Sequence, residues 1–97
     1  MPEGSIYITK LSSHPELYAV AFVPHSGSTL SGLAWRECHR LEEVRDILQH
    51  IGVGEDEIAS ALHSAYQGTS ASIRRVVIDE ATLERLGLRT SDRPGPA

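Results

Sequence analysis

The residues best suited to chemistry in this chain of 97 residues are five histidines and one cysteine. Imidazole and thiolate groups bind zinc, and a cysteine beside a histidine can act as a nucleophile. Zinc sites usually take two ligands from one turn, at spacings such as C-x2-C or H-x3-H, and no pair here has such a spacing. The sequence therefore predicts no metal site, no catalytic residue and no cofactor. The residues concerned are His14, His25, Cys38, His39, His50 and His63.

Cys38 is the only cysteine, so the chain cannot contain an internal disulfide. A lone cysteine at the end of a strand is usually a small apolar core residue. Its neighbour His39 would point to the opposite side of an extended segment. The first residues do not resemble a signal peptide, and no apolar run is long enough to span a bilayer. We therefore expect a cytoplasmic protein that does not contact a membrane.

Residues 44–63 form a helix, a tight turn and a second helix, which is the arrangement of a DNA-reading helix-turn-helix. The second helix of such a motif must enter the major groove beside phosphates. Here that helix begins with Glu55, Asp56 and Glu57 and has no lysine or arginine, and the whole chain has a formal net charge of −4. A nucleic-acid partner is therefore not expected. A DNA-binding regulator that uses 44–63 remains the alternative function.

Apolar residues make up 40% of the chain and charged residues 23%, as in ordinary soluble domains. The length fits one domain, which we place at 5–89. Residues 1–4 are expected to be a disordered start. Residues 90–97 contain two prolines, a glycine and charged residues and are expected to be a disordered tail.

Local patterns predict a small α+β fold with the order β-β-β-α-α-β-α. β-branched and aromatic residues mark the strands, and apolar residues at helical spacing mark the helices. Two consecutive helices return the chain to the end it left, so the last strand should pair antiparallel. We expect a small antiparallel sheet with the helices packed on one face. The predicted strands are 5–11, 16–23, 30–38 and 73–78, and the predicted helices are 40–51, 55–67 and 80–86.

Three residues mark the ends of the predicted helices. Gly52 and Gly87 follow apolar helical runs, and glycine readily takes the left-handed conformation that ends a helix. Asp79 precedes the last predicted helix and can accept a hydrogen bond from its first turn.

The predicted strand 16–23 is apolar on both faces. Leu17, Ala19, Ala21 and Val23 alternate with Tyr18, Val20 and Phe22. Three short helices can cover only one face of a sheet, so the other face needs a different cover. A second copy of the chain is the simplest one, which predicts a homodimer. We therefore expect a non-enzymatic protein–protein interaction or regulatory module that binds itself and also another protein.

Three residues are candidates for contact with a partner: Trp35, Arg36 and Arg75. Tryptophan and arginine are enriched where binding energy is concentrated in protein interfaces. Arg74 and Arg75 are adjacent on a predicted strand and should point to opposite faces. At least one of the two should then lie against a face of the sheet.

Overall fold

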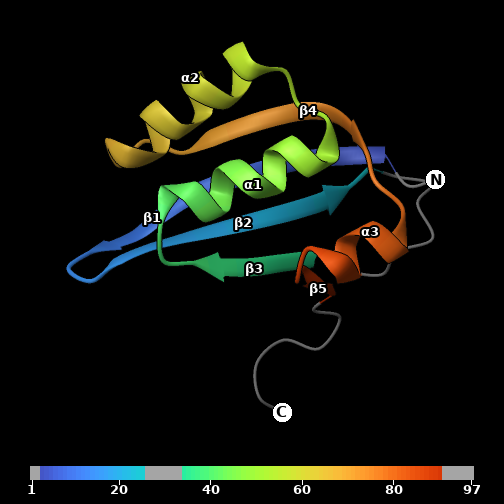
Figure 1. The fold of residues 1–97 in the computed structure, drawn as a ribbon, viewed down its shortest axis with the longest axis horizontal. Helices are drawn as coiled ribbons and strands as arrows, with labels where there is room; N and C mark the ends of the chain where they lie inside the picture. The colour runs from blue at the N-terminus through green and yellow to red at the C-terminus, as the bar shows by residue number, and fades with distance from the viewer. Residues whose placement is uncertain (1–2, 26–33, 91–97) are drawn as a thin grey trace.

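The part of the chain that the structure describes folds into a five-stranded antiparallel sheet with three helices on one face (Figure 1). The structure is a computed structural model that describes residues 3–25 and 34–90. The strands are β1 (Glu3–Ser13), β2 (Glu16–Pro24), β3 (Ala34–Cys38), β4 (Ala71–Val77) and β5 (Arg89–Thr90), and the helices are α1 (Leu41–Ile51), α2 (Glu55–Tyr66) and α3 (Glu80–Arg85). The strands lie side by side in the order β4-β1-β2-β3-β5. The predicted α+β fold is confirmed, and β5 is an addition that the sequence did not predict.

The order of the strands follows from the connections between them. β1 and β2 form a hairpin, and β3 then pairs with the free side of β2. Helices α1 and α2 run roughly antiparallel across the sheet (Figure 1). They return the chain so that β4 pairs antiparallel with β1, as predicted.

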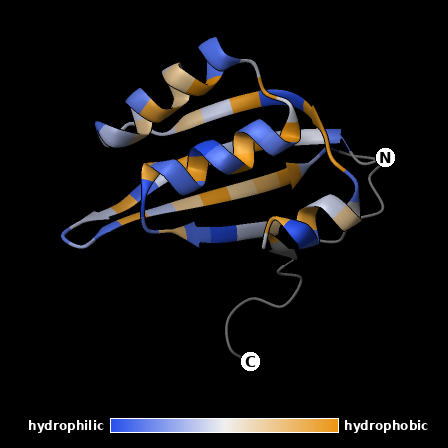
Figure 2. Cartoon of the chain, viewed as in Figure 1, coloured by the Kyte–Doolittle hydropathy of each residue, from blue (hydrophilic) through white to orange (hydrophobic). Residues whose placement is uncertain are grey.

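The core lies between the helices and one face of the sheet. Cross-strand partners supply it: Ile6 lies opposite Phe22, and Tyr18 lies opposite Cys38. All four side chains are fully buried. Figure 2 shows that β2 is apolar along most of its length. The helices contribute seven more buried residues, which are Val44, Ile47, Leu48, Ile58, Ala61, Ala65 and Leu83.

The predicted helix ends are confirmed. Gly52 has φ 96° and donates its N–H to the carbonyl oxygen of Leu48, and the N–H of Val53 donates to the same oxygen at 3.0 Å. This hydrogen-bond pattern satisfies carbonyl groups that have no partner inside the helix. The Asp79 carboxylate accepts a hydrogen bond from the N–H of Thr82 at 2.8 Å, so the predicted cap of α3 is also present.

The ends of the ordered region differ from the prediction. Glu3 and Gly4 belong to β1, so the expected disordered start at 1–4 is wrong for these two residues. Gly4 is buried, and a Cβ atom there would lie 2.2 Å from the carbonyl oxygen of Val23, so only glycine fits. At the other end Thr90 belongs to β5 rather than to the tail. Residues 1–2, 91–97 and 30–33 of the predicted strands and tails lie outside the described residues.

A β-bulge in β4 corrects the prediction for the two adjacent arginines. Gly4 pairs with Val76 and Ile6 pairs with Ile73, so two residues of β4 face one residue of β1. The extra residue places both Arg74 and Arg75 outside the core, and both are exposed rather than divided between the faces. Arg75 takes φ 61°, the left-handed conformation that glycine usually supplies in a bulge.

This conformation predicts opposite effects for two neighbouring substitutions. Arg75→Gly removes the steric cost of the left-handed conformation, whereas Arg74→Gly only adds chain entropy to the unfolded state. We expect Arg75→Gly to be more stable than Arg74→Gly by about 1 kcal/mol. Urea denaturation of the two variants measures this difference. Equal stabilities would show that Arg75 is not strained in solution.

Candidate interaction surface

The face of the sheet that points away from the helices carries a row of exposed aromatic residues. Tyr7 on β1 lies opposite Ala21 on β2, which lies opposite Trp35 on β3. Tyr7 is 44% exposed and Trp35 is 39% exposed. We call the surface formed by Tyr7, Thr9, Ala19, Ala21, Trp35 and Glu37 the outer face.

Small residues form the centre of the outer face. Ala19 and Ala21 are half-buried on β2, between larger side chains on the two neighbouring strands. The residues that alternate with them, Tyr18, Val20 and Phe22, are fully buried under the helices. Strand β2 therefore has apolar side chains on both faces, as its sequence indicates, and the three helices lie on only one of them (Figure 1).

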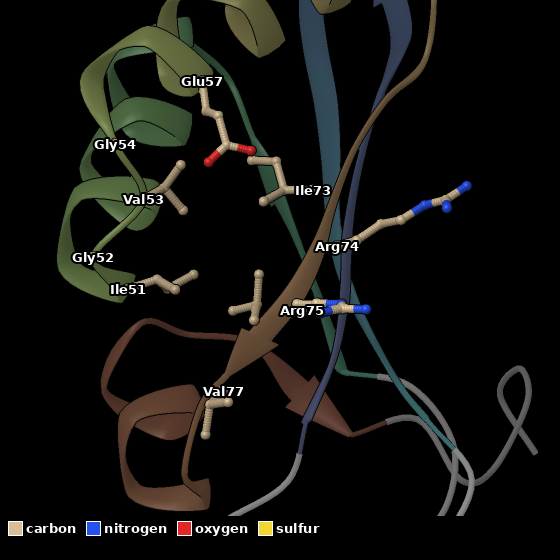
Figure 3. Close-up of a pocket in the computed structure, with 10 residues that line it drawn as sticks. Ile51, Gly52, Val53, Gly54, Glu57, Ile73, Arg74, Arg75 and Val77 are labelled. Carbon is tan, nitrogen blue, oxygen red and sulfur yellow. The ribbon is translucent and has the colours of Figure 1, made fainter.

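Opposite charges flank the outer face. Glu37 is exposed on β3 at one side, and Arg74 and Arg75 are exposed on β4 at the other. Figure 3 shows both arginine side chains extending to the side of β4 away from the helices. The surface thus has an apolar centre, an acidic side and a basic side.

The three predicted contact residues do not come together. Trp35 lies on the outer face, while Arg36 is on the inner face, opposite Val20, because successive strand residues alternate. Arg75 lies in the bulge of β4, on an edge of the sheet beyond β1 and β2. Only Trp35 of the three belongs to the apolar row.

Arg36 makes internal contacts that the sequence did not predict. One terminal nitrogen, Nη1, donates to the carbonyl oxygen of Leu86 at 3.0 Å, at the end of α3. The other, Nη2, lies 3.4 Å from a carboxylate oxygen of Glu43 in the first turn of α1. The same carboxylate oxygen accepts a hydrogen bond from the N–H of His39. Arg36 therefore links β3 to both α1 and α3, and its guanidinium group is already engaged within the chain.

Cys38 is a core residue. Its side chain is fully buried opposite Tyr18, while the neighbouring His39 follows the strand and is exposed. Burial raises the pKa of the Cys38 thiol to about 11, with smaller and opposing contributions from Arg36 and Glu43. The thiol is consequently neutral at physiological pH, which disfavours nucleophilic or metal-binding chemistry at this position.

The histidines are all exposed. His25 has its Nε2 atom 3.2 Å from the Ser5 hydroxyl, and His50 has its Nδ1 atom 2.8 Å from the carbonyl oxygen of Asp46. Across residues 3–25 and 34–90, no three side chains of histidine, cysteine, aspartate or glutamate gather as metal ligands would. In the same residues, none of the helices has the length and apolar character needed to cross a membrane.

The helix pair that resembled a DNA-reading motif packs on the sheet. The first turn of α2 exposes Glu55, Asp56 and Glu57, and Arg45 of α1 lies 3.8 Å from the Glu55 carboxylate. The solvent-facing part of α2 is thus acidic where a recognition helix would approach phosphates. These charges do not favour DNA binding by this helix pair.

Comparison with protein families, curated proteins and solved structures finds no match to this chain. Its function is therefore inferred from the geometry of its own residues.

The contacts of Arg36 predict a structural role. Arg36→Gln removes the ion pair with Glu43 and weakens the bond to the Leu86 carbonyl, so we expect a loss of about 1–2 kcal/mol in the free energy of unfolding. Arg40→Gln is the matched control because Arg40 is exposed and its side chain makes no capping hydrogen bond. The control should change stability by less than about 0.5 kcal/mol. Denaturant unfolding that gives the same value for both variants would contradict the structural role.

The raised pKa of Cys38 predicts that the thiol is alkylated slowly and that the folded protein loses stability at alkaline pH. At pH 8 the thiolate fraction of the folded protein should be about 100-fold lower than in the unfolded chain, so iodoacetamide should label Cys38 slowly without denaturant. As pH rises past 9.0, the ordinary pKa of the thiol, Cys38 ionises in the unfolded chain but stays protonated in the folded protein. The free energy of unfolding therefore falls with pH until the pH reaches the folded pKa of about 11. We expect a loss of about 1 kcal/mol between pH 9 and 10 that is smaller in Cys38→Ala. Labelling of the folded protein at the unfolded rate would contradict this.

Proposed function

We propose that this chain is a non-enzymatic protein–protein interaction or regulatory module that acts as a homodimer through its outer face. The observation that supports this most strongly is the row formed by Tyr7, Ala21 and Trp35 on the side of the sheet opposite the helices. Tyrosine and tryptophan with a flat, small-residue centre are typical of the buried middle of protein interfaces.

The free energy available from burial sets how large the dimer interface must be. Covering one large apolar side chain contributes roughly 1.5–3 kcal/mol, and Tyr7 and Trp35 are already more than half buried. A micromolar dissociation constant needs about 8 kcal/mol. The aromatic row alone is too small, so the dimer must also cover the neighbouring positions on β2 and β3.

The charges support a particular symmetry. In a dimer formed by two outer faces, a two-fold axis can lie in the plane between the two sheets and run parallel to the strands. Such an axis places β4 of one copy over β3 of the other. Arg74 and Arg75 of one copy then lie on the same side of the interface as Glu37 of the other. An axis perpendicular to the strands, in the plane between the sheets, would instead bring the arginines of both copies together, which is unfavourable.

The free, buried thiol of Cys38 is consistent with the reducing conditions of the cytoplasm, where we expect the protein to work. A second protein that the dimer binds or regulates is part of the same proposal.

The homodimer can be tested with the only tryptophan of the chain, because Trp35 lies on the proposed interface. Light scattering at micromolar concentration should give about twice the chain mass of 10.6 kDa. Trp35 emission should shift to shorter wavelength as the protein concentration rises.

Two substitutions test whether dimerisation depends on the outer face or on exposed aromatic side chains in general. Trp35→Ser should raise the dissociation constant at least tenfold, since it removes the largest side chain of the row. Tyr66→Ser is the matched control, because Tyr66 is 57% exposed but lies on α2 at the helical side. A wild-type mass equal to one chain throughout the micromolar range would overturn the proposal.

A further inference from the structure

Strand β4 lies at an edge of the sheet, with β1 on one side only. Within the described residues its other side has no strand partner, and no backbone hydrogen bond outside the sheet involves residues 71–77. Helix α2 and the turn at 52–54 lie next to this side of β4 (Figure 3). The arrangement of a helix beside an open strand edge is one that extended peptides use for binding by strand addition.

Two adjoining hollows follow the open side of β4. One, of about 170 Å³, lies between residues 51–54 and residues 73–77. The other, of about 270 Å³, lies between α2 and residues 70–73. Both are lined by Glu57 and Ile73, so they adjoin at these two residues, and we call the two hollows together the β4 groove.

The β4 groove offers both backbone and side-chain contacts. Its open surface is mainly polar, as expected for a strand edge with free N–H and C=O groups. Ile51, Val53 and Ile73 supply an apolar wall at one end, and Figure 3 shows the Glu57 carboxylate between α2 and β4.

The charge inside the groove is acidic. Arg74 and Arg75 contribute to its lining, but their side chains extend to the far side of β4 (Figure 3). Glu57 is therefore the charged side chain that points toward the groove among the residues that line it. An incoming segment with a lysine or arginine at this point would be complementary.

A second copy of the chain does not fit this edge well. Antiparallel pairing of β4 over its whole length with its own copy across a two-fold axis would bring Arg74 and Arg75 close to the same residues of the other chain, and pairing limited to residues 70–73 would join only a few residues of each copy. The bulge at these arginines also interrupts the regular spacing of hydrogen-bonding groups that a long strand needs. Only a short segment along residues 70–73 can pair regularly.

We propose that the β4 groove binds a short extended segment of a partner protein, which pairs with residues 70–73 and places a lysine or arginine against Glu57. An apolar residue of the segment lies against Ile51 and Val53. This site is separate from the outer face, so it does not depend on the homodimer. It gives the interaction module a specific class of partner, an unstructured basic and apolar peptide.

A library of random octapeptides displayed on phage tests the proposal with the folded protein. Selected peptides should contain a lysine or arginine next to an apolar residue. Glu57→Lys should weaken a selected peptide at least tenfold. Asp56→Lys is the matched control, since it makes the same charge change one residue earlier on α2, at a position that lines neither hollow. It should change affinity less than threefold. Thermal unfolding must show that both variants are folded.

Nuclear magnetic resonance then locates the peptide. On the Trp35→Ser background, which removes the proposed dimer contact, peptide binding should shift the amide signals of residues 57 and 70–73. N-methylation of the alternate peptide nitrogens that face β4 should abolish binding, and N-methylation of the other alternate set should not, because strand addition uses the N–H groups on one side of the peptide.

Several outcomes would overturn the proposal. These are failure to enrich any peptide, equal affinity for wild type and Glu57→Lys, and signal shifts confined to the outer face. Concentration-dependent broadening at residues 70–73 without peptide would assign the groove to a second copy and would also overturn it.

Discussion

Tyr18, Val20 and Phe22 are fully buried on the strand at the middle of the sheet, and the rest of the molecule is arranged around them. Each has a cross-strand partner on both β1 and β3, so the same three positions fix two strand registers. The helices must cover these side chains, and they therefore lie on one face. The alternation of side chains along a strand then places Ala19 and Ala21 on the other face, next to Tyr7 and Trp35. The exposed aromatic row is thus a direct consequence of how the core is built.

Local sequence patterns were sufficient to predict the structural features that depend on a few neighbouring residues. Gly52 ends α1 and Asp79 caps α3 because each acts through backbone groups within its own turn. The two apolar faces of β2 also follow from alternation along one segment. Features that depend on pairing between distant segments were not predictable. β5 has only two residues, and Gly4 is ordered because it fits closely against the backbone at Val23.

The candidate contact residues also differ in whether their position depends on their own segment or on distant segments of the chain. Trp35 could be placed on a strand face from its own segment, although the sequence alone did not say which face the helices cover. The internal contacts of Arg36 could not be predicted, because its partner carbonyl at Leu86 is 50 residues away in the chain. Arg75 takes a left-handed conformation that sequence reasoning assigns to glycine, so no local signal indicated the bulge. Glu57 was noted only as one of three acidic residues at a helix start, and its position beside β4 depends on the tertiary fold.

The extra residue in β4 allows the strand to lose one residue at this point without a change in the register of the segment that follows. The bulge lets Ile73 and Val76, which are three positions apart, both face the core. Removal of either arginine would restore simple alternation, in which Ile73 and Val76 are two positions apart and still face the same side of the sheet. Val76 would stay opposite Gly4, and Ile78, which is buried just before α3, would keep its place in the core. A single-codon deletion at this point would therefore remove the bulge and its left-handed residue, while the segment that leads into α3 stays in register.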